Sequence, residues 1–575
     1  MRRQIMAGVA FLAALPALAG LGTAQGRARR GRGAQEAPAA HTTLPPSAQA
    51  ALDGISAERI RAHVRFLAHD LLEGRGTGQR GGDIAAEYLA AQLALDGLKP
   101  AGENGTYLQK VPMIGVRTLP ETAFRFVPES GAAMELKLLD DYVVNNESQT
   151  ATADIHAPIV FVGYGIAAPE YKWDDYKGAD LRGKVLLMLV NEPPSDDEKF
   201  FKGKALTYYG RWIYKFEEAA RRGAVGALII HRTDMASYGW EVVRNSWGTE
   251  KAYLRSAGGP TLEAGSWIQL EVARKLVGLA GLDLDKLFES AKSREFRPIP
   301  LPVELEARVV SELRPFESNN VVAALPGADP KRRAEAVLFT AHYDHLGIVT
   351  GAPGDHIYNG AVDNATGCGM LLEMARAYSS LKASARPART ILFSAVTGEE
   401  QGLLGSEYLG QHPPIARERI SLDLNFDALD PIGIPEEVEV SGSERTSFYA
   451  VVVETAKRFG LAIRPDSEPG AGHYYRSDHF SLARVGIPAF SVDQGRKFAG
   501  HTVAWGEQEA RDYNEHRYHQ PSDEYHPDMD FRGNAKMARF GFALCWEAAS
   551  LPGLVGWVAG DEFEAARQQS LAGKE

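Results

Sequence analysis

The sequence predicts an α/β protein with a mostly parallel mixed sheet, helices on both faces, and a smaller β-rich α/β domain inserted in the chain. Three observations support this. At 575 residues the chain is long enough for two or three domains. Its composition, 45% hydrophobic and 24% charged, is that of a globular protein. From Asn319 onward, strand-like and helix-like segments alternate with βαβ spacing, which favours a parallel sheet covered on both sides.

The chain before this alternation begins with helices. From Ser56, apolar residues recur at three- and four-residue spacing, and a second such run covers residues 84–95. Between them lies a glycine-rich turn, residues 73–78. It lacks the lysine and the preceding strand of a phosphate-binding loop, so it does not indicate a nucleotide site.

Apolar segments typical of strands predominate in the middle of the chain. Residues 157–165, 183–190 and 223–230 are predicted strands, and residues 214–222 a helix. Because this part has no gathering of His, Asp and Glu, we interpret it as an inserted module that shapes access or binds a partner. The predicted organisation is a catalytic N-terminal part (51–138), an inserted domain (139–312), a metal-binding core (313–555) and a C-terminal tail (556–575).

The core alternation can be assigned segment by segment. The predicted strands are 336–340, 390–396, 420–426 and 486–492, and the predicted helices are 367–381 and 447–459. In such sheets the chemistry lies beyond the carboxyl ends of the strands.

The first residues have the pattern of a secretory signal peptide. Arg2 and Arg3 precede an uncharged apolar run, residues 5–19, which ends in small residues suited to cleavage. An uncleaved membrane anchor is the alternative. Residues 20–50 are rich in Gly, Arg, Ala and Pro and are predicted to be a flexible linker. We expect an exported protein, periplasmic or extracellular, without a stable membrane anchor.

Charge and cysteine content exclude other classes. The formal charge is −11, and becomes −13 once Arg2 and Arg3 leave with the leader, which argues against nucleic-acid binding. Only Cys368 and Cys545 are present, so a disulfide-stapled scaffold is excluded, and both are expected to fill the core.

Polar side chains follow several predicted core strands. Strand 336–340 leads into His342 and Asp344, which share a strand face. Asp344 could hold the other ring nitrogen of the histidine or act on a nucleophilic water. Alone, the pair is also consistent with surface residues after an edge strand.

Three further segments add carboxylates and a second histidine. Asp363 precedes a predicted helix and could equally be its cap. Glu399 and Glu400 lie between an apolar strand and an apolar turn, a costly place for carboxylates without a cation. Asp427 follows strand 420–426, and His519 follows a long polar loop.

Together these residues form a metal-ligand set. Two imidazoles and three carboxylates suit a pair of divalent ions, zinc above all, each held by one histidine and one terminal carboxylate while a third carboxylate bridges them. The five predicted ligands are His342, Asp363, Glu400, Asp427 and His519.

The strings around these ligands resemble the di-zinc exopeptidases of peptidase family M28, which include leucine-type aminopeptidases, glutamate carboxypeptidase and single-zinc glutaminyl cyclases. The strings are 341–345, 359–364, 398–406, 425–427 and 518–521. The turn 71–78 is similar to one before the family's second helix. Residues 162–165 and 180–185 look like a protease-associated domain.

The resemblance implies a zinc exopeptidase fold of the phosphorylase/hydrolase type and a role for each ligand. His342 and Asp427 would hold one zinc, Glu400 and His519 the other, and Asp363 would bridge. Glu399 would be the general base. Asp344 would support His342, and Tyr518 would donate to the oxyanion.

We therefore expect a secreted aminopeptidase that acts on peptides. Carboxypeptidase or dipeptidase action in the same family is the first alternative, with Arg476 or Arg496 available for a substrate carboxylate. Cyclase-type acyl transfer and a non-catalytic receptor-like protein follow. We interpret residues 477–479 as pocket lining or ligand support, and His345, His473 and His501 as ordinary polar residues. The sequence leaves the oligomeric state open.

Overall fold

A sheet of 15 strands organises the part of the chain that the computed structural model describes, residues 44–236, 238–256, 258–349 and 354–573. The predicted signal peptide and most of the predicted linker lie outside these residues. The last linker residues are helical, because α1 (Pro46–Asp53) packs Ala48 into the core. None of the described helices is long and apolar enough to span a membrane.

One half of the sheet, called the core half, is parallel as predicted. Its strands are β14 (Ala336–His342), β17 (Thr390–Val396), β18 (Ile420–Asn425) and β21 (Ala489–Ser491), in the order β21-β18-β14-β17. Every residue of β14 and β17 is buried, as expected for strands covered on both faces. The sequence predicted these strands to within three residues at each end.

Helices cover both faces of the core half. On one face of the sheet, Val337 and Phe339 of β14 pack against helices. Leu338, which lies between them in the sequence, faces the opposite layer, where Phe480 lies. Both predicted core helices, α9 and α11, are present. The first layer is α2 (Ala57–Leu67), α3 (Arg80–Leu95), α9 (Gly367–Ser379), α11 (Tyr449–Arg458) and α14 (Arg532–Ser550), and the second includes α12 (His479–Arg484) beside α10 (Leu404–Gln411).

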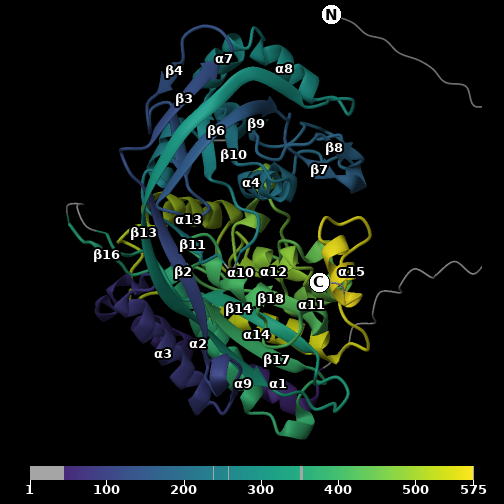
Figure 1. Ribbon diagram of the computed structural model, residues 1–575. Coiled ribbons are helices and arrows are strands. Elements are labelled where there is room, and N and C mark those ends of the chain that lie inside the picture. The colour runs from purple at the N-terminus through teal and green to yellow at the C-terminus, as the bar shows by residue number, and fades with distance from the viewer. Residues whose placement is uncertain (1–43, 237, 257, 350–353, 574–575) are drawn as a thin grey trace, which may run out of the picture. The chain divides into compact units, whose positions relative to one another are not determined.

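A single strand of 27 residues, β13 (Ile299–Leu325), belongs to both halves of the sheet (Figure 1). Up to Val310 it pairs with strands of the second half, called the insert half. From Ser311 it pairs with β2 (Leu108–Thr118), and further on with β17. The predicted boundary at residues 312–313 therefore falls inside one continuous strand, next to the change of partners.

The insert half is a mixed sheet with its own helices. It includes residues 123–136, which the sequence analysis had assigned to the preceding part. Besides the first part of β13, its strands are β3 (Ala123–Pro128), β4 (Met134–Leu136), β5 (Tyr142–Asn145), β6 (Thr152–Phe161), β9 (Val185–Leu189), β10 (Gly226–His231) and β12 (Ala264–Gln269). Its helices include α4 (Trp212–Arg221), α6 (Trp240–Trp247), α7 (Leu270–Leu279) and α8 (Leu284–Ala291). A protease-associated identity for it stays a prediction.

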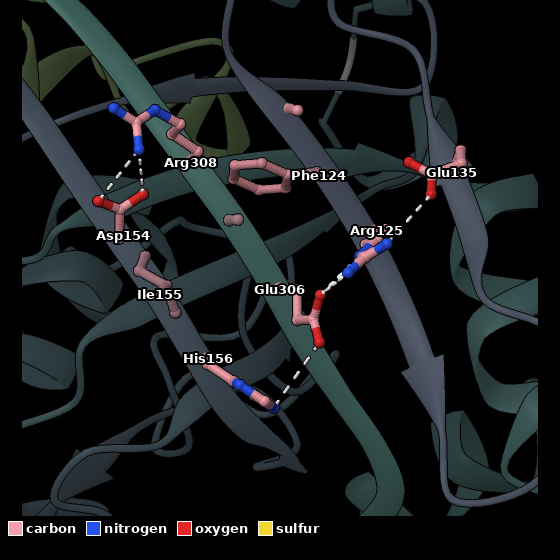
Figure 2. A pocket seen from close by; sticks show the side chains of 10 residues that line it. Phe124, Arg125, Glu135, Asp154, Ile155, His156, Glu306 and Arg308 are labelled. Carbon is pink, nitrogen blue, oxygen red and sulfur yellow. Dashed lines mark hydrogen bonds and ion pairs between the residues drawn. The ribbon is translucent and has the colours of Figure 1, made fainter.

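One surface of the insert half carries a ladder of paired charges (Figure 2). Glu306 on β13 lies opposite Arg125 on β3 and His156 on β6, and Arg308 lies opposite Asp154. The Arg125 Nε to Glu306 Oε2 distance is 2.6 Å. Cross-strand pairs of opposite charge stabilise a solvent-facing sheet surface. These pairs line a hollow of 410 Å³, and their pairing explains the charged residues there without a ligand.

The C-terminal residues pack against the core. Arg445 is buried and donates to both oxygens of Asp561 at 2.8 and 2.9 Å, and to Glu562 at 2.6 Å. The other oxygen of Glu562 accepts the backbone N–H of Tyr208, in the segment before α4. The predicted tail thus links the core to the inserted segment, and it ends in α15 (Glu564–Leu571).

Candidate metal centre

The five predicted ligands come together at the carboxyl ends of adjacent parallel strands. His342 ends β14, while Glu400 and Asp427 follow its neighbours β17 and β18. Asp363 comes from the turn before α9, and His519 from the segment after α13 (Val503–His516). Helix α13 is a correction, because the segment before His519 is predicted from the sequence to be a long polar loop.

Asp363 lies between the two histidines. Its Oδ1 is 3.1 Å from His342 Nε2, and its Oδ2 is 3.3 Å from His519 Nε2. Each histidine also meets a second carboxylate: His342 Nε2 is 3.0 Å from Asp427 Oδ1, and His519 Nε2 is 3.1 Å from Glu400 Oε2. The arrangement is two histidine–carboxylate pairs that share one aspartate.

The donor set fits a pair of divalent ions. The atoms that would bind are imidazole nitrogens and carboxylate oxygens, the ligands that zinc and similar ions accept. The side chains of Asp363 and Glu400 are 5% and 2% exposed, so their charges need compensation. Three sets of possible ligand atoms each lie within 4.8 Å of one another: His342, Asp363 and Asp427; His342, Glu399 and Glu400; His345, Asp363 and Glu400.

Burial and charge perturb the titration of these groups. Burial raises the pKa of Glu399 well above its ordinary value, and the nearby carboxylates of Glu400 and Asp427 add to this. Burial would lower the pKa of His519, but its hydrogen bonds to Asp363 and Glu400 raise it to about 10. A side chain such as Glu399, which holds protons readily and lies beside the predicted ligands, is suited to proton transfer.

His342 is supported by a backbone carbonyl. Its Nδ1 lies 3.2 Å from the carbonyl oxygen of Asp344 and 4.0 Å from the carboxylate. The carboxylate of Asp344 instead accepts hydrogen bonds from the Thr77 hydroxyl at 2.6 Å and from the backbone N–H of Glu399 at 3.4 Å. The expected support of His342 therefore comes from the main chain of Asp344, while its side chain holds other segments.

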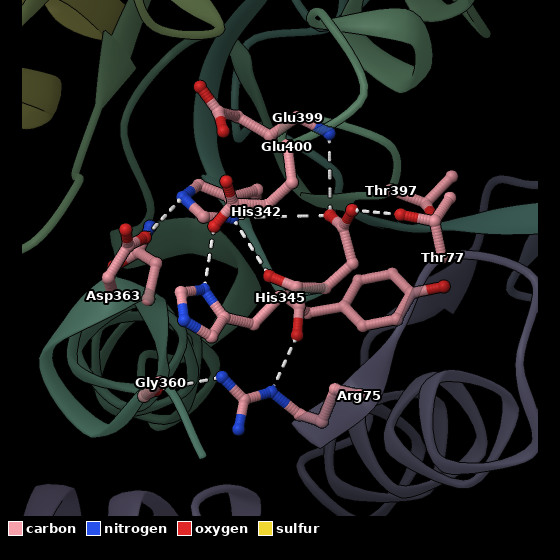
Figure 3. Close-up of polar contacts among 12 residues, drawn as sticks. Arg75, Thr77, His342, His345, Gly360, Asp363, Thr397, Glu399 and Glu400 are labelled. Carbon is pink, nitrogen blue, oxygen red and sulfur yellow. Dashed lines mark hydrogen bonds and ion pairs between the residues drawn. The ribbon is translucent and has the colours of Figure 1, made fainter. Parts of the chain in front are cut away.

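His345 belongs to the site, and its interpretation as an ordinary polar residue was wrong. It is fully buried, and its Nδ1 lies 2.6 Å from Glu400 Oε1 (Figure 3). An ionised carboxylate only accepts hydrogen bonds, so Nδ1 is the donor. The available signal was its place three residues after His342, at the end of a buried strand.

Asp523 was also missed. It accepts backbone hydrogen bonds from Val362 and Asp363, and its own carbonyl accepts one from Ala361. It thereby fixes the turn that carries Asp363. The helix-cap alternative for Asp363 is excluded, because Asn364 Oδ1 accepts the N–H of Gly367, the first residue of α9.

Ser477 supports a predicted ligand, in line with the interpretation of residues 477–479. Its hydroxyl donates to Asp427 Oδ2 at 2.6 Å and accepts from the Asn425 amide at 2.7 Å. Asp478 and His479 are buried behind it.

The site opens to solvent beside Tyr518. This residue is 44% exposed, and its ring stacks on His519 with centroids 3.9 Å apart. Burial of the hydroxyl raises its pKa above the ordinary value, so the phenol stays protonated and able to donate. The side chains of His519 and Asp427 are 36% and 20% exposed, so a small molecule can reach these predicted ligands here.

A pocket of 260 Å³ lies where the insert half meets the segment that carries Ser477. It is lined by Arg211, which precedes α4, and by Arg476, next to Ser477, together with aromatic residues that include Trp212 and Tyr238. Burial lowers the pKa of Arg211, and the charge of Arg476 contributes. Two guanidinium groups this close favour an anionic ligand. Arg496, the other sequence candidate, does not line this pocket.

Comparison with known proteins identifies relatives of part of the chain. Residues 320–540 match the model described as Peptidase family M28. A "Leupeptin-inactivating enzyme 1" of Streptomyces exfoliatus is 31% identical over 199 residues, 32% of this chain and 39% of that protein. A "Probable zinc metalloprotease" of Pyricularia oryzae is 37% identical over 121 residues, 20% of this chain and 22% of that protein. The chain therefore matches less than half the length of these curated relatives.

Solved structures of similar proteins also exist. An aminopeptidase from an Aneurinibacillus species aligns over 88% of this chain and 97% of its own, with 17% identity and a TM-score of 0.45. A peptidase precursor from Shewanella amazonensis aligns over 88% of this chain and 99% of its own, with 18% identity and a TM-score of 0.38.

Proposed function

We propose that the protein is a secreted two-zinc aminopeptidase that removes N-terminal residues from peptides, and the premise is that residues 320–540 match the model described as Peptidase family M28. The observation that carries the proposal is the bridging position of Asp363, with one oxygen on His342 and the other on His519. Relatives named as zinc metalloprotease and as leupeptin-inactivating enzyme support zinc and peptide substrates.

The residues would divide the work as follows. His342 and Asp427 would hold one zinc, His519 and Glu400 the other, and Asp363 would contact both. When bound, the ions would lower the pKa of a water towards about 7 and polarise the scissile carbonyl.

Proton transfer would fall to Glu399, whose carboxylate is next to the ligands and is not needed as one. It would accept the proton of the attacking water and return it to the leaving amine, a contribution of about 100- to 10,000-fold. Tyr518, with its protonated hydroxyl at the open side of the site, would donate a hydrogen bond to the developing oxyanion.

One observation favours a second function, carboxypeptidase or dipeptidase action. The pocket that holds Arg211 and Arg476 adjoins the residue that hydrogen bonds to Asp427. Two arginines there would suit the free carboxylate of a short peptide or an acidic side chain.

A two-by-two peptide series tests both functions. The same short peptide is prepared with a free or acetylated amino terminus and with a free or amidated carboxyl terminus, and each is incubated with the mature protein, with chelator, and with zinc added back. Aminopeptidase action requires the free amine only. Carboxypeptidase action requires the free carboxylate only, and a dipeptidase requires both. Absence of hydrolysis with two zinc ions bound would overturn the peptidase proposal, and a single bound ion would favour the cyclase-type alternative.

A further inference from the structure

The turn of residues 75–77, which the proposed chemistry does not use, is built into the metal site from the N-terminal part of the chain. Arg75 is fully buried. Its guanidinium donates to the carbonyl oxygens of Tyr343 at 2.7 Å and Gly360 at 2.8 Å, and also to those of Leu67 and Asn359. It thus ties the segment after β14 to the turn that carries Asp363 (Figure 3).

Gly360 explains how close this packing is. A Cβ atom on Gly360 would lie 2.2 Å from the carbonyl oxygen of Asp363 and 2.6 Å from Cγ of His345. The backbone of this turn therefore rests directly on the His345 ring, and Arg75 holds that backbone in place. His345 has little freedom to rotate.

Two separate hydrogen-bond paths lead from the turn to the adjacent acids Glu399 and Glu400. In the first, the Thr77 hydroxyl donates to Asp344 Oδ2 at 2.6 Å, and Asp344 Oδ1 accepts the backbone N–H of Glu399. In the second, the carbonyl of Arg75 accepts the N–H of His345 at 3.2 Å, and His345 Nδ1 donates to Glu400 Oε1 at 2.6 Å. Gly76 and His345 also form a parallel bridge.

We infer that residues 75–77 position the acid pair, Thr77 acting through Asp344 on Glu399 and Arg75 acting through His345 on Glu400. The inference rests on the proposed function, in which Glu399 moves protons and Glu400 holds zinc. Thr77 and His345 are thus positioning residues with different consequences. Loss of the first path changes the rate of chemistry, whereas loss of the second weakens one metal site.

Matched variants separate the two paths. Thr77→Val removes the hydroxyl at nearly constant volume, and Thr77→Ser keeps it. His345→Leu removes the donor, and His345→Asn retains an amide N–H near the position of Nδ1. For all four variants we would measure zinc stoichiometry and affinity against a competing chelator, kcat and KM on the cleaved peptide, and thermal unfolding of the metal-free protein.

The expected results differ between the pairs. Thr77→Val keeps both zinc ions and the KM of the wild type but loses kcat by about 10- to 100-fold, and Thr77→Ser restores it. His345→Leu binds one of the two ions about 10- to 100-fold more weakly, and His345→Asn recovers most of that affinity. Cobalt substitution gives a second readout, because a disturbed ligand changes the visible absorption of one ion.

Unchanged kcat in Thr77→Val together with unchanged zinc affinity in His345→Leu would overturn the inference. If metal-free His345→Leu unfolds at a temperature well below that of the wild type, His345→Ser replaces it. The serine variant removes the imidazole without burying a larger apolar group. If the wild type binds no zinc, the proposed function fails. If it binds two ions but cleaves no peptide, the peptidase assignment fails, and the zinc affinities of the His345 variants still decide the second path.

Discussion

Asp523 accepts the backbone N–H of Asp363 at 3.1 Å, so a residue four positions after His519 fixes the turn that carries the bridging carboxylate. Two predicted ligands from distant parts of the sequence, Asp363 and His519, are thereby connected through one buried side chain. Burial raises the pKa of Asp523 to about 6, so at neutral pH the carboxylate is ionised and accepts strongly.

Asp523→Ala is expected to weaken metal binding about 10- to 100-fold, because the turn of Asp363 loses two of its hydrogen bonds. Competition with a chelator measures the loss. Asp528→Ala, at a nearby exposed aspartate, is the control and should bind metal normally. Equal affinity of the two variants would show that the turn holds its shape without Asp523.

Glu399→Gln should keep its metal and lose turnover by about 100- to 10,000-fold, because the amide cannot accept the proton. Glu400→Ala should lose metal as well as turnover. Metal analysis and kcat on the same preparations check both statements. Two ions retained in Glu400→Ala would contradict the assignment of Glu400 as a ligand.

Arg211→Gln and Arg476→Gln are expected to raise KM for peptides with a free carboxyl terminus more than for the matched amides, since each removes a cation from the pocket. Arg496→Gln serves as the control, because Arg496 does not line that pocket. Steady-state kinetics on the free and amidated peptides gives the ratio. The same ratio in all three variants would mean that the pocket does not read the carboxylate.

His479 predicts an acid sensitivity of the fold. Burial lowers its pKa from 6.5 to about 3. Between about pH 6.5 and 3 the histidine is therefore protonated in the unfolded chain but neutral in the folded protein. As the pH drops through this range, the free energy of unfolding falls. At pH 5 the loss from this one residue is about 2 kcal/mol. Urea unfolding of metal-free wild type and His479→Phe at pH 5 and 7 should show a smaller pH difference in the variant. Equal differences would exclude His479 as the source.

Deletion of residues 561–575 should destabilise the protein by about 3–5 kcal/mol, because it leaves the buried Arg445 without its carboxylates. Urea unfolding measures this. In an Arg445→Met background the same deletion should cost less, and an equal cost would assign the loss to packing of the segment instead.

The parallel strands of the fold could be predicted because strands buried on both faces consist of nearly continuous runs of apolar residues, as in β14 and β17. Four of the five predicted ligands could be singled out for the same reason, because each is a polar residue directly beyond such a run or next to a predicted helix, whereas His519 follows a segment that was predicted to be a polar loop. Helix α13 was missed because it has only two buried residues, Gly506 and Tyr513, and so carries no apolar stripe.

The supporting residues of the site could not be predicted from local pattern. Arg75 and Asp523 act on main-chain atoms far away in sequence, and a residue that binds backbone leaves no complementary side chain to recognise. His345 looked ordinary because its partner, Glu400, comes after the neighbouring strand β17 and is 55 residues away in sequence. Such contacts depend on which strands become neighbours, which the alternation of elements does not specify.

The continuity of β13 has a consequence for how the two halves of the sheet can be changed. Because the strand passes from one set of partners to the other between Val310 and Ser311 without a loop, no flexible joint exists there that could be cut or lengthened. A replacement for the insert half would have to return the chain already extended and in register with β2 and β17. Sliding by one residue would turn every side chain of the returning strand to the opposite face. The pairing register of β13 therefore restricts which domains can replace the insert half.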